Sequence, residues 1–225
     1  MDAPLAVASA YLAVIVGGFA AVALWETSWP ARAPRAPLVR RWPANVGLMA
    51  INHGALPLLL PVSNAGAAWL AAERGLGLFH AIDAPPALAF VATLVAMDAF
   101  RYAWHRLLHR VPALWRLHRV HHSDLDYDCT LALRFHPLEA LASVLLLSGG
   151  VVALGAPIEA VVASDLSTIA LGYVAHGNLR IAPAIDRVLR LAIVTPAMHA
   201  THHSVEADEA MSNFGAVLSV WDRWL

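Results

Sequence analysis

The chain has 225 residues, of which 59% are hydrophobic and 14% charged, and its mean hydropathy is +0.60. Because a soluble domain carries about 25% charged residues, this composition favours a membrane protein. The formal net charge of −1 gives no reason to expect a nucleic-acid partner. The single cysteine, Cys129, excludes an intramolecular disulfide and a thiolate metal cluster.

Five apolar stretches are long enough to cross a bilayer, whose hydrocarbon core is about 30 Å thick. They cover roughly residues 4–25, 44–62, 85–104, 137–154 and 157–176. The first begins with Met1-Asp2 rather than a basic segment, so we interpret it as a retained anchor and not as a secretory signal. The pattern predicts an all-α integral membrane protein, a helical bundle with four or five spans.

Ten of the twelve histidines lie in a patterned set between residues 105 and 203. His105 and His109 form an HxxxH motif, and segments 118–122 and 199–203 both read HxxHH. On a helix these spacings place side chains on one face, so each motif can aim two or three imidazoles at a common point. Imidazole binds zinc, iron, copper and nickel. The recurrence of the spacing favours a histidine-walled metal site over the alternative, surface histidines on amphipathic helices.

The arginines predict how the spans are oriented. Arg32, Arg35, Arg40 and Arg41 lie between the first two apolar stretches, and the positive-inside rule places such a loop in the cytoplasm. Counting spans from there puts every patterned histidine at the same, cytoplasmic face. The small size and the absence of a retention signal favour a bacterial inner membrane.

Carboxylates are expected near an all-imidazole site, because neutral ligands leave the charge of divalent metals uncompensated. A metal-bound histidine also usually donates its second ring N–H to a carboxylate or a carbonyl. Asp98 lies two helical turns before His105, and Asp165 falls in the middle of a predicted span. For Asp165 the alternative is a hydrogen-bonded pair between helices. The candidates to support the ligands or line the active site are Asp98, Asp124, Glu139, Asp165 and Asp222.

Several motifs resemble, in the same order, those of the fatty acid hydroxylase/sterol desaturase superfamily. They are Asp98-Ala-Phe-Arg-Tyr-Ala-Trp-His-Arg-Leu-Leu-His109, Pro112-Ala-Leu-Trp-Arg-Leu-His-Arg-Val-His-His-Ser123, Arg134-Phe-His-Pro-Leu-Glu139, His176-Gly-Asn178, His199-Ala-Thr-His-His-Ser204, Asn213-Phe-Gly215 and Trp221-Asp-Arg223. We therefore expect a catalytic domain over residues 85–225. It should form one continuous fold with the spans in residues 1–84, to which the sequence assigns no role.

The resemblance implies a membrane enzyme with a histidine-rich dimetal centre that uses dioxygen to hydroxylate or desaturate lipid C–H bonds. The expected cofactors are two iron ions, because dioxygen activation needs a redox metal, although zinc can replace iron in a purified sample. The expected partners are a lipid from the bilayer and an external electron donor such as a ferredoxin, a cytochrome or a reductase. By matched motif the ligands are His105, His109, His118, His121, His122, His176, His199, His202 and His203, with His136 as a further ligand or a hydrogen-bond donor.

Two other hypotheses fit the same residues. The site could serve a carotenoid-type or ether-lipid oxygenase, because the motifs do not specify the substrate. The protein could instead be a non-catalytic metal-binding membrane protein, such as a carrier or a sensor. A carrier should place polar ligands along a transmembrane path, whereas the histidines here are expected to gather at one face.

Overall fold

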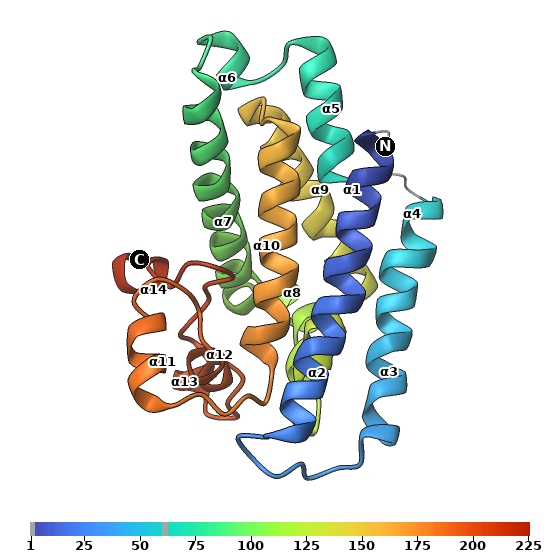
Figure 1. Ribbon diagram of the computed structural model, residues 1–225, viewed down its shortest axis with the longest axis vertical. Helices are drawn as coiled ribbons and strands as arrows, with labels where there is room; N and C mark the ends of the chain where they lie inside the picture. Colours follow the sequence, from blue (N-terminus) through green and yellow to red (C-terminus); the bar gives the residue numbers. More distant parts are fainter. Residues whose placement is uncertain (1–2, 60–62) are drawn as a thin grey trace.

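The computed structural model describes residues 3–59 and 63–225, and its regular secondary structure is helical. These residues contain no strand, only two isolated β-bridges, Pro30 with Leu179 and Ile193 with Leu218. The helical segments that are long and apolar enough to cross a membrane are Val7–Ser28, Pro86–Arg110, Pro137–Leu154 and Ile158–His176. They run roughly side by side in Figure 1. The predicted all-α fold is thus confirmed, with four candidate spans.

The N-terminal part of the chain forms two long helical segments and two shorter helices. The first segment consists of α1 (Ala3–Leu12), the π-helical η1 (Ala13–Gly18) and α2 (Phe19–Ser28). The second consists of α3 (Leu38–Ala50), the π-helical η2 (Ile51–Ala55) and α4 (Leu56–Leu59). It corresponds to the predicted span 44–62, whose last three residues lie outside the described residues. Next come α5 (Asn64–Arg74) and α6 (Leu78–Ala81).

The C-terminal part combines three long helices with a set of short ones. The long helices are α7 (Pro86–Arg110), α9 (Pro137–Leu154) and α10 (Ile158–His176). Between α7 and α9 lie α8 (Pro112–His118) and the 3₁₀ turns η3 (His121–Ser123) and η4 (Cys129–Leu133). Last come α11 (Pro183–Leu189), α12 (Pro196–His202), α13 (Ala207–Ala210) and α14 (Trp221–Trp224). These four lie beside the lower halves of α7 and α10 in Figure 1.

Proline and glycine fix where the long helices begin and end. A proline stands at the first helical position of α7, α8, α9, α11 and α12, where its fixed φ suits the helix and its missing N–H costs no hydrogen bond. Helix α9 ends at Gly155, whose φ of 67° favours glycine. A Cβ atom there would lie 2.5 Å from the Leu76 carbonyl oxygen. The α9–α10 turn can therefore pack closely against the loop after α5.

A polar network joins several helices inside the bundle and centres on Asp165 of α10. The Asp165 carboxylate accepts hydrogen bonds from Tyr11 of α1 (3.1 Å), Asn64 of α5 (3.1 Å) and Arg101 of α7 (2.6 Å). Ser148 of α9 donates to the Asn64 side-chain oxygen at 3.1 Å. Ionisable groups inside a membrane bundle are costly unless they are paired. Asp165 therefore forms hydrogen bonds between helices, which is the alternative considered for this residue from the sequence.

The buried apolar side chains form two clusters. One lies between α2, η4 and α10 and contains Val22, Ala23, Cys129, Leu133, Tyr173 and Leu179. The other joins α5, α7, α9 and α10 through Ala68, Met97, Val151, Ala156 and Val161. Large apolar side chains such as Leu88, Leu145 and Leu146 are exposed on the candidate spans, as expected for surfaces that face lipid.

Candidate metal centre

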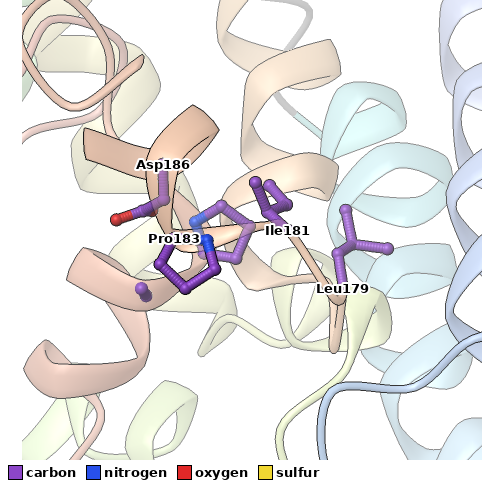
Figure 2. A pocket seen from close by; sticks show the side chains of 6 residues that line it. Leu179, Ile181, Pro183 and Asp186 are labelled. Atoms are coloured by element: carbon purple, nitrogen blue, oxygen red, sulfur yellow. The ribbon is translucent and has the colours of Figure 1, made fainter. Parts of the chain in front are cut away.

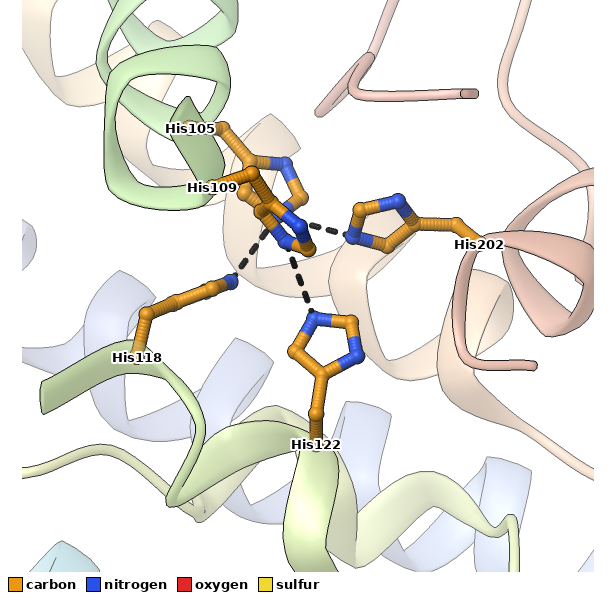
Figure 3. Close-up of side chains that lie close together, drawn as sticks. All are labelled: His105, His109, His118, His122 and His202. Carbon is orange, nitrogen blue, oxygen red and sulfur yellow. Dashed lines mark hydrogen bonds between the residues drawn. The ribbon is translucent and has the colours of Figure 1, made fainter. Parts of the chain in front are cut away.

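Nine of the ten candidate histidine ligands gather in two adjacent groups. Site A consists of His105, His109, His118, His122 and His202, and site B consists of His121, His176, His199 and His203. In each group the candidate ligand atoms all lie within 4.8 Å of one another. Figure 3 shows the five imidazoles of site A converging from α7, from the α8–η3 segment and from α12.

Each HxxHH segment contributes to both sites. In the first, His118 and His122 enter site A while His121 enters site B. In the second the assignment is reversed, because His199 and His203 enter site B while His202 enters site A. Residues four apart share a helix face, and the intervening histidine points elsewhere. The prediction that each motif aims at a common point therefore holds for the spacing of four but not for whole motifs.

The distances between ring nitrogens match those of ligands on a shared metal ion. In site A the Nε2 atom of His105 lies 3.1 Å from that of His118 and 3.0 Å from that of His202. In site B the Nε2 atom of His176 lies 3.1 Å from that of His121 and 2.9 Å from that of His199. With metal–nitrogen bonds of about 2.0–2.1 Å, two ligands at right angles have nitrogens about 3 Å apart.

Hydrogen bonds on the far side of the rings fix which nitrogen carries the proton. In site A the Nδ1 atoms of His105 and His202 donate to the carbonyl oxygens of Phe214 (2.9 Å) and Ser212 (2.7 Å). A carbonyl oxygen can only accept, so each Nε2 keeps a bare lone pair. Two such lone pairs face each other at 3.0 Å and repel unless a cation lies between them. The donor set therefore fits a metal ion.

The same arrangement recurs in site B. The Nδ1 atoms of His121 and His176 donate to the carbonyl oxygens of Arg134 (3.2 Å) and Gly172 (2.7 Å). Burial, followed by neighbouring imidazoles, lowers the pKa of those site A and site B histidines that lie outside the candidate spans well below 6.5. They are His118, His121, His122, His199, His202 and His203. These imidazoles are consequently neutral near pH 7, which metal binding requires.

Glu139 is the candidate carboxylate that contacts a ligand. It lies in the first turn of α9, is 2% exposed, and its Oε1 atom accepts a hydrogen bond from His118 Nδ1 at 2.7 Å. Its Oε2 atom has no hydrogen-bond partner among the described residues. A buried carboxylate at this position both orients the imidazole and offsets positive charge in site A.

The other candidates hold the surrounding chain rather than an imidazole. Asp98 accepts hydrogen bonds from the Val217 and Leu218 N–H groups and from the Trp221 indole. His136 lies outside both sites, and its Nδ1 atom accepts from the Leu138 N–H and so caps α9.

Asp222 and Asp124 also bind neighbouring chain. Asp222 accepts from the Phe214 and Gly215 N–H groups, and Asp124 accepts from Arg41 and Asn45.

Phe214 and Tyr127 are two of the aromatic residues that line the sites and were not singled out from the sequence. Phe214 is 4% exposed, and its ring centroid lies 5.7 Å from that of His105 and 5.3 Å from that of His109. Tyr127 packs edge-on against His203 of site B at 5.4 Å. The only sequence signal was for Phe214, which stands inside the Asn-Phe-Gly motif. Both rings shield the imidazoles from water.

Two pockets lie near the centre. One, of about 270 Å³, is lined by Leu179, Ile181, Pro183, Asp186, Pro196 and Ala197, at the start of the histidine-bearing α12 (Figure 2). The other, of about 280 Å³, lies between α7 and α10 and is lined mainly by apolar side chains, among them Val91, Leu94 and Leu218. The second reaches Asp98 and Ser164 and borders two candidate spans.

Fold and site together define a class of protein, an apolar helical bundle with a histidine-lined centre suited to two metal ions. The chain belongs to the fatty acid hydroxylase family, because the family model described as fatty acid hydroxylase matches residues 90–225. The matched region contains every histidine of sites A and B. It begins within α7, so α1 to α6 precede it.

Curated relatives act on lipids. An ornithine lipid hydroxylase, OlsE, of Rhizobium tropici is 33% identical over 143 residues, which are 63% of this chain and 42% of that protein. The alkylglycerol monooxygenase of Homo sapiens is 29% identical over 128 residues, which are 55% of this chain and 27% of that protein. The chain thus spans less than half the length of these relatives. No solved structure matches the chain.

Proposed function

We propose that the protein is a membrane-bound di-iron oxygenase that hydroxylates or desaturates a C–H bond of a lipid, using dioxygen and electrons from a separate donor. The observation that carries the proposal is the pair of histidine groups whose bare Nε2 atoms lie 2.9–3.1 Å apart. The chemistry that two redox-active metals supply is the activation of dioxygen. The family membership and the lipid-modifying relatives support the substrate class.

The protein's own residues prepare the site. Neutral imidazoles offer lone pairs without a prior loss of protons, and Glu139 offsets charge beside His118. Phe214 and Tyr127 restrict access of water to the imidazoles. The pocket between α7 and α10 is lined by residues of two candidate spans, and we propose that it admits an alkyl chain laterally from the bilayer. The four arginines Arg32, Arg35, Arg40 and Arg41, in the loop before α3 and in its first turn, support a cytoplasmic site, and we propose a bacterial inner membrane.

An ether lipid is a second candidate substrate, favoured by the alkylglycerol monooxygenases among the relatives. Ornithine lipid hydroxylase favours hydroxylation of a polar lipid instead. Comparing the lipids of cells with and without the protein distinguishes these substrates by the mass of the product. An added oxygen on an intact lipid indicates hydroxylation, whereas loss of two hydrogens indicates desaturation.

The first test is elemental analysis of the detergent-purified protein from iron-supplemented cells. About two metal ions per chain with iron among them would support the proposal, because the two histidine groups suit one ion each. Two zinc ions would support the dimetal centre and call for reconstitution with iron. Folded protein without stoichiometric metal would refute the proposal. It would also refute the alternative of a metal carrier or sensor, because that alternative depends on the same site.

A further inference from the structure

The helices that precede the family-matched region contact the segments that hold site B. Three buried polar side chains on these helices, Glu26, Asn45 and Asn52, are 4%, 0% and 8% exposed. Each hydrogen-bonds to a residue after α8 that either contacts a site B histidine or lies within two residues of one. Burying polar groups in an apolar bundle is unfavourable unless they are paired. The hydrogen-bond partners of these side chains therefore show which part of the metal centre the N-terminal helices contact.

Asn45 of α3 holds the residue that accepts the His121 hydrogen bond. Its Oδ1 atom accepts from the Arg134 guanidinium at 2.7 Å, and its Nδ2 atom donates to Asp124 and Thr130, each at 2.8 Å. The carbonyl oxygen of Arg134 in turn accepts from His121 Nδ1. Asn45 is thus connected to the site B ligand His121 through one intervening residue, Arg134.

Asn52 of η2 acts on the next residue of the same segment. Its Nδ2 atom donates to the carbonyl oxygen of Phe135 at 3.0 Å. The Phe135 ring stacks on the His121 imidazole, with a centroid distance of 4.6 Å and an interplanar angle of 10°. His121 is therefore fixed by a hydrogen bond to Arg134 and by the stacked ring of Phe135. An asparagine hydrogen-bonds to each of these two residues.

Two charged side chains complete the support. Arg41 of α3 pairs with Asp124 at 2.6 Å and with Asp128 at 2.7 Å. The first pair fixes the Asp124 carboxylate, which accepts a hydrogen bond from Asn45. Glu26 of α2 accepts a hydrogen bond from the Asn178 N–H at 2.9 Å, two residues after the site B ligand His176. The Arg41 and Glu26 side chains are both buried.

Site A has a different set of supports. Its imidazoles donate to Phe214, Ser212 and Glu139. In the part of the chain that the structure describes, none of these three residues hydrogen-bonds to α1–α6. The N-terminal helices therefore reach site A less directly than site B, through Asp124 and through Arg134, which also donates to Val120 and Ser123 on either side of the two adjacent ligands.

We propose that α2, α3 and η2 position the ligands of site B, with Asn45 and Asn52 as positioning residues for His121. This inference rests on the dimetal centre of the proposed function, but not on its substrate. Loss of either asparagine should keep His121 as a ligand, but its imidazole should no longer be held in a single orientation. Changes to groups that orient a ligand typically weaken metal binding about 10–100-fold.

The test is Co²⁺ binding to metal-free protein in detergent, followed by the visible absorption of imidazole-bound Co²⁺. We expect Asn45→Ala to weaken site B about 10–100-fold and to weaken site A by a smaller factor. In the double variant Asn45→Ala/His199→Ala, both changes affect site B, so the number of tight Co²⁺ sites should fall little further than in Asn45→Ala. Adding His122→Ala should instead remove the remaining tight site. Asn52→Ala should weaken the same site by a smaller factor, and it serves if Asn45→Ala does not fold.

Asn64→Ala is the matched control, because Asn64 is also a hydrogen-bonded asparagine of the bundle, but within residues 3–59 and 63–225 its side chain hydrogen-bonds only to Asp165 and Ser148. It should lower the thermal midpoint and keep both Co²⁺ affinities. Two wild-type affinities in folded Asn45→Ala or Asn52→Ala would overturn the inference alone, as would an equal loss in Asn64→Ala. Wild-type protein that binds no Co²⁺ would overturn the proposed function as well.

Discussion

Site A and site B use the same kind of ligand but are completed and supported differently. Site A has five imidazoles, three of which hydrogen-bond through their second nitrogen to residues of the family-matched region. Site B has four, and within the described chain the His199 Nδ1 and His203 Nε2 atoms have no hydrogen-bond partner. A metal in site B therefore has more coordination positions left for other ligands. The family-matched segment holds all the ligands and their direct hydrogen-bond partners, and on our proposal the helices before it orient site B through those partners.

The largest effect is expected from removing one imidazole from either site. His202→Ala takes a ligand from site A and His121→Ala takes one from site B. Each should abolish product formation and lower the metal content to one ion per chain or less, with the bundle still folded. Metal analysis and lipid profiling measure this, and His53→Ala, an exposed histidine outside both sites, should keep the metal content. Normal turnover in either ligand variant would refute the requirement for both sites.

Removing the charge of Glu139 should affect site A alone. Glu139→Gln can keep a hydrogen bond to His118 but loses the negative charge, so we expect the site A affinity for metal to fall about 10–100-fold. The Co²⁺ titration described above measures both sites in one experiment. An equal loss at site B would show that the carboxylate acts on the whole centre and would weaken the distinction between the sites.

Asp98 should matter for stability first and for site A second. Asp98→Asn loses charge and acceptor capacity toward three donors, two in the loop before α14 and one at the start of α14. Because unpaired buried donors cost about 1–3 kcal/mol, thermal unfolding of the metal-free protein should shift downward. Asp83→Asn, at an exposed position before α7, is the control and should leave the midpoint unchanged. A drop in site B affinity without a drop in stability would contradict this role.

The smallest effect is expected at His136. His136→Ala removes the cap of α9 and should lower the free energy of unfolding by about 1 kcal/mol, while both sites keep their metal. His136→Asn should restore most of the stability, because asparagine is also a good cap. Loss of one metal ion in His136→Ala would instead return this histidine to the set of ligands.

The sequence predicted the parts of the centre that depend on local spacing. His105 with His109 and His118 with His122 are four residues apart, and a helix or tight turn suffices to bring each pair together. The all-α fold likewise follows from long apolar runs. A dimetal centre was expected from the resemblance, but which histidine belongs to which site was not predicted, because whether His121 and His122 diverge depends on the 3₁₀ turn that contains them.

Contacts between distant segments could not be predicted in the same way. Asp98 and Asp165 are ionisable groups in apolar helices, which marks them as unusual, but their partners Trp221 and Arg101 lie on other elements. Asn45 and Asn52 belong to no motif that the sequence reading recognised. Their role became visible only when the packing of α3 placed them against Arg134 and Phe135.

The network around Asp165 also has a consequence for how the chain enters the membrane during synthesis. An unpaired charged residue at the centre of an inserting helix costs about 2.5–3.5 kcal/mol, and the bundle pairs two charged residues from different spans, Arg101 of α7 and Asp165 of α10. Because α7 is synthesised first, its arginine awaits a partner until α10 emerges about sixty residues later. Insertion of α10 is then favoured by a helix already in place. We therefore expect the biogenesis machinery to release α7 through α10 into the lipid as a group.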